Sequence, residues 1–104
     1  MEVVTFNSIV DEFILSLERQ TQGATFRYMA LLEIYGNNLN FPRSRKLENG
    51  IYELRIKSSQ QVRLLYTFHN NRAVILHGFV KKSQKTPVRE LELARARINL
   101  LHSS

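Results

Sequence analysis

The chain has 104 residues, enough for one domain with one hydrophobic core and too few for two. It contains no cysteine, which excludes a disulfide scaffold, a thiolate nucleophile and thiolate metal sites. Fifteen Lys and Arg against nine Asp and Glu give a net charge of +6, which favours a polyanionic partner such as nucleic acid.

The N-terminal part of the chain predicts a short strand and two helices. Met1–Phe6 carries β-branched residues and can form an edge strand. Apolar residues at helical spacing predict an amphipathic helix over about residues 8–20, with a cap at Asn7-Ser8. Thr21-Gln22-Gly23 is expected to break this helix, and a second helix is predicted over about residues 24–35. The two helices are expected to form a hairpin.

Three strands are predicted in the middle of the chain, after a basic loop over residues 38–46. Ile51–Lys57 and Val62–Phe68 alternate apolar and polar side chains, as strands with one buried face do. Ala73–Val80 is apolar almost throughout, which is typical of a strand covered on both faces. Asn70-Asn71 is a suitable two-residue hairpin turn, because asparagine tolerates a positive φ.

A C-terminal helix is predicted to begin at Thr86-Pro87, with Thr86 as the cap and Pro87 in the first turn. It carries an apolar stripe at spacings of three, four and three residues, formed by Leu91, Ala94, Ile98 and Leu101. Residues 1–104 are therefore predicted to be a single α+β domain. This domain would have two N-terminal helices, an antiparallel sheet of three to four strands and a C-terminal helix.

The positive charge is concentrated in the C-terminal part of the chain. Residues 1–41 carry a net charge of −3, whereas residues 42–104 carry +9. A basic half-domain attracts a polyanion through counterion release, so its binding should weaken as salt is added. The alternative is that this charge serves only to keep the domain in solution.

Adjacent strands are expected to bring cations together on one sheet face. Opposed residues in an antiparallel pair share a face, so Arg63 must lie opposite either Lys57 or Arg55. Opposed like charges cost up to about 1 kcal/mol per pair, so a fold that keeps them is expected to use them. The one nearby carboxylate on that face is Glu53. A solvated polar sheet face is the alternative interpretation.

The same parity predicts a phosphate-binding groove. Its floor and rim are expected to be formed by Arg55, Lys57, Arg63, Lys81, Lys82 and Lys85. A two-residue turn would place Gly78 near Arg63, where a glycine leaves room for a ligand backbone. The turn also places His77 with Ile75 and Phe79 on the helix-covered face, as a core histidine or a catalytic one. The three histidines lack the close spacing of a metal site.

Residues 47–98 resemble the phage-derived branch of the RelE/HigB toxins, which belong to the RelE/ParE superfamily. The likeness is carried by four segments in order, namely GIYELRI, VRLLY, ILHGFVKK with KTP after it, and ELARAR. The resemblance implies a compact sheet with two N-terminal helices on one face and a C-terminal helix near a cleft.

The resemblance also implies an activity, which is cleavage of mRNA in the ribosomal decoding site without a metal or organic cofactor. Cations in the cleft of such toxins hold the phosphodiester while the neighbouring 2′-hydroxyl attacks it. By their place in the motifs, Arg55 and Arg63 match the family's basic strand residues, and Lys81 or Lys82 matches the cation after the last strand. The residues expected to be catalytic are Arg55, Arg63 and Lys82. Those expected to bind flanking phosphates or ribosomal RNA are Arg43, Arg45, Lys46, Lys57, Lys81 and Lys85.

Two departures from the family pattern leave proton transfer unassigned. Several members place a tyrosine or histidine after the last basic segment, but Val80–Leu101 contains neither. Glu53 stands where some relatives carry another lysine. General acid–base catalysis is often worth ~100-fold or more in rate, so these departures point to slow or altered cleavage. The candidates for this role are His77, Lys57 and Glu90.

Partners and location follow from the same resemblance. It implies an antitoxin, usually a helix-turn-helix protein encoded next to the toxin, besides the ribosome and mRNA. The alternatives are a non-catalytic inhibitor of DNA gyrase, like the ParE relatives, and a phage-derived module that only binds nucleic acid or protein. No apolar run approaches the roughly 20 residues that span a bilayer, and Met1–Phe6 lacks a cationic signal-peptide start. We therefore expect a cytoplasmic protein.

Overall fold

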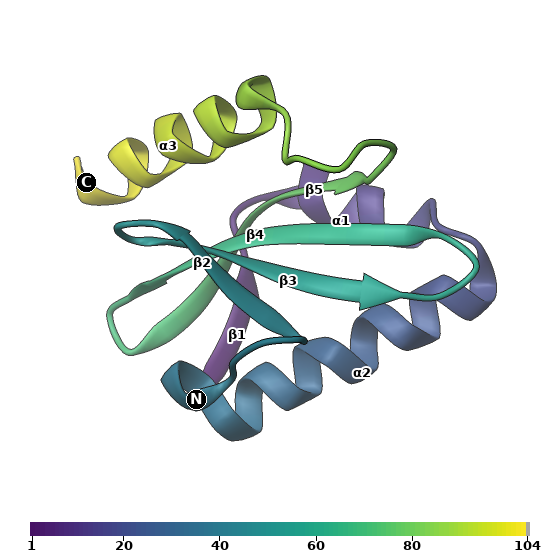
Figure 1. The fold of residues 1–104 in the computed structure, drawn as a ribbon. Helices are drawn as coiled ribbons and strands as arrows, with labels where there is room; N and C mark the ends of the chain where they lie inside the picture. Colours follow the sequence, from purple (N-terminus) through teal and green to yellow (C-terminus); the bar gives the residue numbers. More distant parts are fainter. Residues whose placement is uncertain (104) are drawn as a thin grey trace.

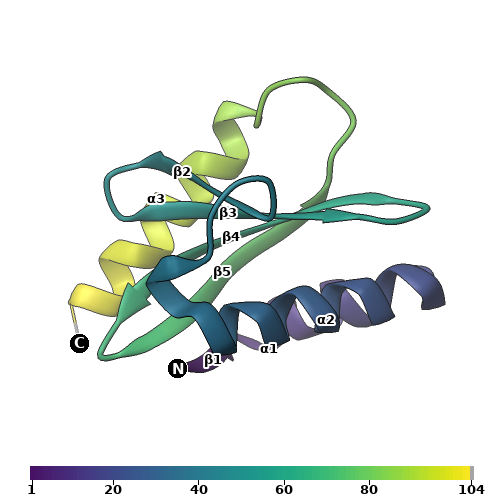
Figure 2. The same cartoon turned by 60° about the horizontal axis from the view of Figure 1, so that its bottom comes forward.

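The computed structural model describes residues 1–103 and shows one sheet with helices on both faces (Figures 1 and 2). The strands are β1 (Glu2–Thr5), β2 (Ser44–Glu48), β3 (Ile51–Lys57), β4 (Gln61–His69) and β5 (Arg72–Val80). The helices are α1 (Ser8–Leu15), α2 (Arg19–Tyr35), the short 3-10 helix η1 (Gly36–Asn38) and α3 (Val88–His102). The predicted α+β architecture, with two N-terminal helices and a C-terminal helix, is confirmed.

The sheet is mixed and has five strands in the order β1-β5-β4-β3-β2. The pairs from β2 to β5 are antiparallel, whereas β1 pairs parallel with β5. The predicted hairpins and the edge position of the first strand are confirmed. The predicted sheet of three to four antiparallel strands is wrong in two respects, because β2 lies partly inside the expected loop and β1 runs parallel to its neighbour. Such a short, charged strand as β2 is typical of a sheet edge.

The break between the first two helices lies at residues 16–18, so the predicted break at Thr21-Gln22-Gly23 is wrong. Thr21 and Thr25 are both buried within α2, and the Thr25 hydroxyl donates to the Thr21 carbonyl oxygen at 2.8 Å. The Thr21 hydroxyl shares a hydrogen bond with the Ser59 hydroxyl at 3.2 Å, so both buried threonine side chains have partners within a continuous helix. At the end of α1, the Ser16 hydroxyl donates to the Phe13 carbonyl oxygen at 2.6 Å.

Helix α3 begins at Val88, and Thr86 does not cap it as predicted. Pro87 occupies the cap position without a side-chain hydrogen bond. The Thr86 hydroxyl instead donates to Glu53 Oε2 at 2.6 Å, which ties the β5–α3 connection to the sheet. The predicted apolar stripe of α3 is confirmed, because Ala94 is fully buried and its three partners pack against the same core.

Each face of the sheet carries its own apolar core. On the α1/α2 face, the central strands contribute the buried side chains Leu54, Ile56, Val62, Leu64, Tyr66, Ala73 and Ile75. On the α3 face they contribute Ile51, Leu65, Val74, Leu76 and Phe79. The predicted alternation in β3 and β4 and the coverage of β5 on both faces are therefore confirmed. Among residues 1–103, no helix is both long and apolar enough to cross a membrane.

A β-bulge in β5 shifts the register of the β4–β5 pair next to Arg63. The turn residues Asn70 and Asn71 have φ values of 52° and 60°, as predicted for a two-residue turn. The pairing then jumps by one position, because Tyr66 pairs with Ile75 but Leu65 pairs with His77. Leu76 is the extra residue on β5, so Gly78 and His77 do not lie where they were predicted to lie.

Gly78 is displaced to the other face of the sheet by this bulge. It pairs with Leu64, and Phe79 takes the place opposite Arg63 that was predicted for the glycine. His77 stacks on Phe79, with ring centroids 5.9 Å apart. Ile75 belongs to the α1/α2 core, so the predicted grouping of His77 with Ile75 is wrong.

We expect Gly78→Ala to lower the free energy of unfolding by about 1–3 kcal/mol through overpacking. A Cβ at this position would lie 2.6 Å from two ring carbons of Phe13 and 2.8 Å from Leu64 Cδ2. The matched control is Gly23→Ala, whose new Cβ lies 3.5 Å from its nearest neighbour. That control should raise stability by about 0.5–1 kcal/mol, because alanine favours the helix. Urea titration checks both values, and an unchanged midpoint for Gly78→Ala would contradict the close approach of Phe13.

Candidate nucleic-acid interface

Two arginines face each other directly across the β3–β4 pair. Arg55 pairs with Arg63, and Lys57 pairs with Gln61. The prediction that a cation lies opposite Arg63 is confirmed, and of the two registers left open the structure takes the one with Arg55. The side chains share the α3 face of the sheet, where Phe79 of the α3 core lies opposite Arg63.

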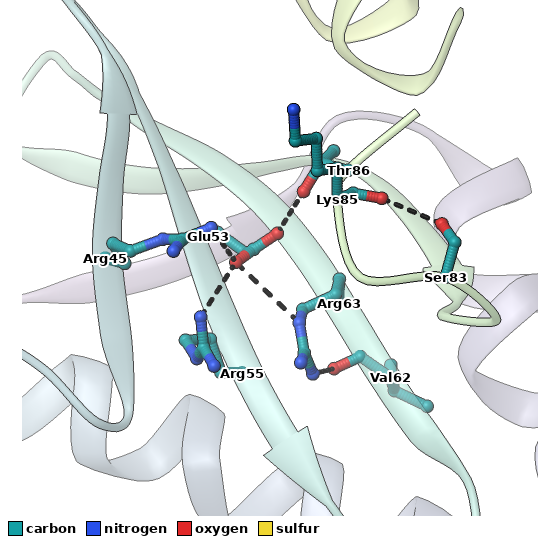
Figure 3. Close-up of polar contacts among 8 residues, drawn as sticks. All are labelled: Arg45, Glu53, Arg55, Val62, Arg63, Ser83, Lys85 and Thr86. Atoms are coloured by element: carbon teal, nitrogen blue, oxygen red, sulfur yellow. Dashed lines mark hydrogen bonds and ion pairs between the residues drawn. The ribbon is translucent and has the colours of Figure 1, made fainter. Parts of the chain in front are cut away.

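A fully buried carboxylate, that of Glu53, lies at the centre of this cluster (Figure 3). Its Oε1 atom is 3.7 Å from Arg45 Nη2, 3.6 Å from Arg55 Nη1 and 3.7 Å from Arg63 Nε. Neither Oε1 nor Arg63 Nε has a hydrogen-bond partner among the described residues. The three guanidinium groups therefore meet Oε1 at ion-pair distance without a hydrogen bond to it, and Arg63 Nη1 donates to the Val62 carbonyl oxygen at 3.1 Å. Three cations around one carboxylate leave a net positive charge of two.

The three arginines differ in how far they reach solvent. The side chains of Arg45, Arg55 and Arg63 are 46%, 20% and 4% exposed. Burial lowers the pKa of Arg63, Glu53 raises it, and the charges of Arg55 and Arg45 lower it again. Arginine stays protonated in proteins, so Arg63 is a fixed positive charge beneath the surface. Arg55 and Arg45 are the members that a ligand can touch.

A cleft of about 450 Å³ opens beside these arginines. Its lining contains four cations and no carboxylate, and consists of Arg55, Gln61, Arg63, Lys81, Lys82, Ser83 and Gln84. The Lys81 amide donates to the Gln61 carbonyl oxygen at 2.7 Å, which fixes the start of the β5–α3 connection. Burial lowers the pKa of the Lys81 ammonium, and the charge of Arg63 lowers it further. The cleft volume lies within the roughly 300–1,000 Å³ that is usual for small-molecule sites.

A smaller pocket of about 170 Å³ adjoins the cleft and shares two of its arginines. It is lined by Tyr28, Phe41, Pro42, Arg43, Arg55, Lys57 and Arg63. The Arg55 amide donates to the Arg43 carbonyl oxygen at 2.8 Å, which fixes the loop before β2 against β3. The Arg55 guanidinium carbon lies 5.3 Å from the centroid of the Phe41 ring.

The structure brings most of the predicted site residues together and separates two of them. The cleft takes in Arg55, Arg63, Lys81 and Lys82, the smaller pocket takes in Lys57 and Arg43, and Arg45 contacts Glu53. Lys46 pairs with Tyr52, so it lies on the α1/α2 face, away from the cluster. Lys85 does not line the cleft as predicted, and its ammonium points away from Glu53 in Figure 3.

The rim of the cleft differs from the predicted one because the β5–α3 connection is bent back on itself. The Ser83 hydroxyl donates to the Lys85 carbonyl oxygen at 2.9 Å. This bend places Ser83 and Gln84 in the cleft lining, where Lys85 was expected. It also brings Thr86 to Glu53.

Of the three candidates for proton transfer, one lies beside the cluster. His77 Nε2 is 3.0 Å from Glu90 Oε1, and this pair joins β5 to α3 outside the cleft. Lys57 lines the smaller pocket. Within the described residues, no three His, Asp or Glu side chains are grouped so that they could hold a metal ion.

The sequence did not predict that Glu53 lies at the centre of three arginines or that Phe41 lies beside Arg55. Parity places Glu53 on the face of Arg55, but the third arginine, Arg45, comes from β2, at a position where the sequence predicts a loop. Phe41 lies before β2 and is 65% exposed, so no periodic pattern marks it. The signal that was available is an aromatic residue directly before the cations of residues 43–46.

Comparison with known proteins identifies the family to which this chain belongs. No curated protein sequence matches the chain. A family model described as phage derived protein Gp49-like (DUF891) matches residues 12–99, which is most of the chain and includes the whole cation cluster. This family is part of the RelE/ParE-like toxin superfamily, so the resemblance to phage-derived toxins is confirmed at that level. The matched residues and the α+β sheet lead to one conclusion, that the chain belongs to the phage-derived Gp49-like family.

Proposed function

We propose that this protein is a toxin that cleaves mRNA on the ribosome, as a ribosome-dependent endoribonuclease of the RelE/HigB type. The observation that carries the proposal is the cleft whose lining holds four cations and no carboxylate. Phosphates bind such a surface, and a fixed array of cations stabilises negative charge that develops during reaction. Membership of a phage-derived, toxin-type family supports the same reading.

The chemistry combines this electrostatic field with two proton transfers. The 2′-hydroxyl next to the scissile bond loses its proton as its oxygen attacks phosphorus, and charge builds on the non-bridging oxygens. The bond to the 5′-oxygen breaks and that oxygen takes up a proton, which leaves a 2′,3′-cyclic phosphate and a 5′-hydroxyl. Arg55 and Lys82 would contact the non-bridging oxygens, while the buried Arg63 adds positive charge from below. Lys81 lines the cleft, and burial and neighbouring cations lower the pKa of its ammonium, so it is a candidate for proton transfer.

The second candidate function is non-catalytic inhibition of DNA gyrase, as in the ParE relatives, or binding of nucleic acid or protein alone. Two structural observations favour it. Glu53 neutralises part of the cluster, and neither tyrosine nor histidine lines the cleft. A surface with this composition can bind a polyanion without cutting it.

The deciding experiment adds the purified protein to translating ribosomes and, separately, to a gyrase supercoiling reaction. Under the proposal, primer extension detects new mRNA ends on ribosomes, and free mRNA stays intact. Uncut mRNA together with blocked supercoiling would replace the proposal with the gyrase-directed function. If neither reaction changes, a module that only binds is left.

An antitoxin partner and action in the cytoplasm are part of the same proposal. The partner would be a helix-turn-helix protein encoded next to this chain. Co-expression of that neighbouring protein should restore growth to cells arrested by the toxin. Continued arrest despite a stable neighbouring protein would contradict the pairing.

A further inference from the structure

We propose that Phe41 is a stacking platform for an unpaired RNA base, and that a path for single-stranded RNA runs from the cationic cleft past Phe41 to Tyr35. This inference rests on the proposed function only in that both take RNA as the ligand. It assigns base-binding roles to two aromatic residues, whereas the cleft accounts only for phosphate.

Phe41 lies at the surface beside a residue of the phosphate cleft. The residue is 65% exposed, although a phenylalanine gains more than most residues from burial. The Arg55 guanidinium carbon lies 5.3 Å from the ring centroid, within cation–π distance. The ring is thus held beside a residue of the phosphate cleft and keeps most of its surface available to a ligand.

The cleft and two neighbouring pockets are joined by shared arginines. Arg55 and Arg63 line both the cleft and the smaller pocket of about 170 Å³ that contains Phe41, which we call the Phe41 pocket. Arg43 lines both the Phe41 pocket and a further pocket of about 220 Å³, whose aromatic member is Tyr35. Tyr35 is 52% exposed. Cations and exposed aromatic rings therefore alternate along one continuous surface.

The alternation of cations and aromatic rings identifies the ligand class. Cations that follow a backbone and aromatic rings that stack on bases are the combination that single-stranded nucleic acids need. The bases of a duplex are already stacked inside it, so they cannot lie on Phe41. An apolar pocket between α1 and α2 is lined by Thr5, Asp11, Ile14, Leu15, Phe26 and Met29, and this lining contains no cation. It therefore offers a matched aromatic control.

The test measures binding of a labelled tetranucleotide of 2′-O-methyl RNA, which cannot be cleaved by 2′-oxygen attack. Phe41→Ala should weaken binding about 5- to 150-fold, because stacking on an aromatic side chain is worth about 1–3 kcal/mol per base. Phe41→Trp should retain the affinity, and Phe26→Ala should leave it unchanged. Tyr35→Ala should weaken binding of the tetranucleotide but not of a dinucleotide.

An abasic tetranucleotide with the same phosphates separates stacking from charge. Its affinity should be the same for the wild type and for Phe41→Ala, and both should show the same salt dependence. Equal losses on the normal and abasic strands would overturn the proposal, since Phe41 would then act only by positioning Arg55. An unchanged affinity of Phe41→Ala for the normal strand, or no binding of that strand by the wild type, would also overturn it.

These outcomes are independent of the cleavage assay. If the ribosome assay fails but Phe41→Ala discriminates the two strands, only the proposed enzymatic function falls. If mRNA is cut on ribosomes but Phe41→Ala binds like the wild type, only the stacking path falls. Binding of a glutamate-rich peptide in place of the oligonucleotide would point to a protein occupant and would overturn the RNA assignment.

Discussion

Replacing Glu53 with alanine is expected to lower the free energy of unfolding by about 3–5 kcal/mol, the usual effect of removing one partner from a buried ion pair. The variant would leave Arg63 4% exposed and directly opposite Arg55, with no carboxylate at ion-pair distance. It would also remove the acceptor of the Thr86 hydroxyl. A loss of this size is a large part of the stability of a small domain.

Glu53→Gln removes the negative charge of residue 53 but keeps the size and shape of its side chain. The amide keeps the volume and can still accept from Thr86, so its cost should be smaller than that of alanine. Combining Glu53→Gln with Arg63→Met removes both buried charges and should recover part of the loss. Urea unfolding measures all of these variants, and Glu48→Gln is the control, because Glu48 pairs with Arg95 at the surface.

An unchanged unfolding midpoint for Glu53→Ala would show that Glu53 does not hold the arginines in place. A second readout follows from the charge of the cluster. Where Glu53→Gln remains folded, the cleft is more positive by one charge, so it should bind a short oligonucleotide more tightly, and more so at low salt. Tighter binding with lower stability would identify Glu53 as a structural counter-charge for the cluster.

Much of the sheet could be predicted because successive side chains of a β-strand point to opposite faces, so buried and exposed faces appear as alternating apolar and polar residues. Period-two alternation gave β3 and β4 and left Arg63 two possible partners, of which the structure selects Arg55. The positive φ values of Asn70 and Asn71 confirm the turn. These features depend on near neighbours in the chain, so a single sequence contains them.

The features that were missed depend on contacts between distant segments. The bulge at Leu76 adds one apolar residue to an apolar strand and leaves no change in pattern. Thr86 resembles a helix cap, but a carboxylate 33 positions away binds its hydroxyl instead. The ring of three arginines around Glu53 needs β2, a five-residue strand with four polar or charged residues. Its pairing with β3 cannot be read from periodicity.

The largest functional effect is expected from Arg55. This residue lines both the cleft and the Phe41 pocket, and its side chain is 20% exposed. Under the proposed function, Arg55→Ala should reduce mRNA cleavage on ribosomes about 100- to 1,000-fold, as removal of a donor to a developing oxyanion does. Arg55→Lys should restore part of the rate, because it keeps the charge without the two parallel donors.

Arg55 is a sharper target than Arg63, for which we also expect loss of growth arrest on replacement by alanine. Arg63 is almost fully buried against Glu53, so Arg63→Ala changes the folded cluster together with the site. After Arg55→Ala, Glu53 still has Arg45 and Arg63 nearby, so the protein should fold. The control is Arg27→Ala, because Arg27 is an exposed residue of α2 that lines neither the cleft nor the Phe41 pocket. Full cleavage by a folded Arg55→Ala protein would remove the cationic cleft from the mechanism, since its most accessible arginine would then take no part in the reaction.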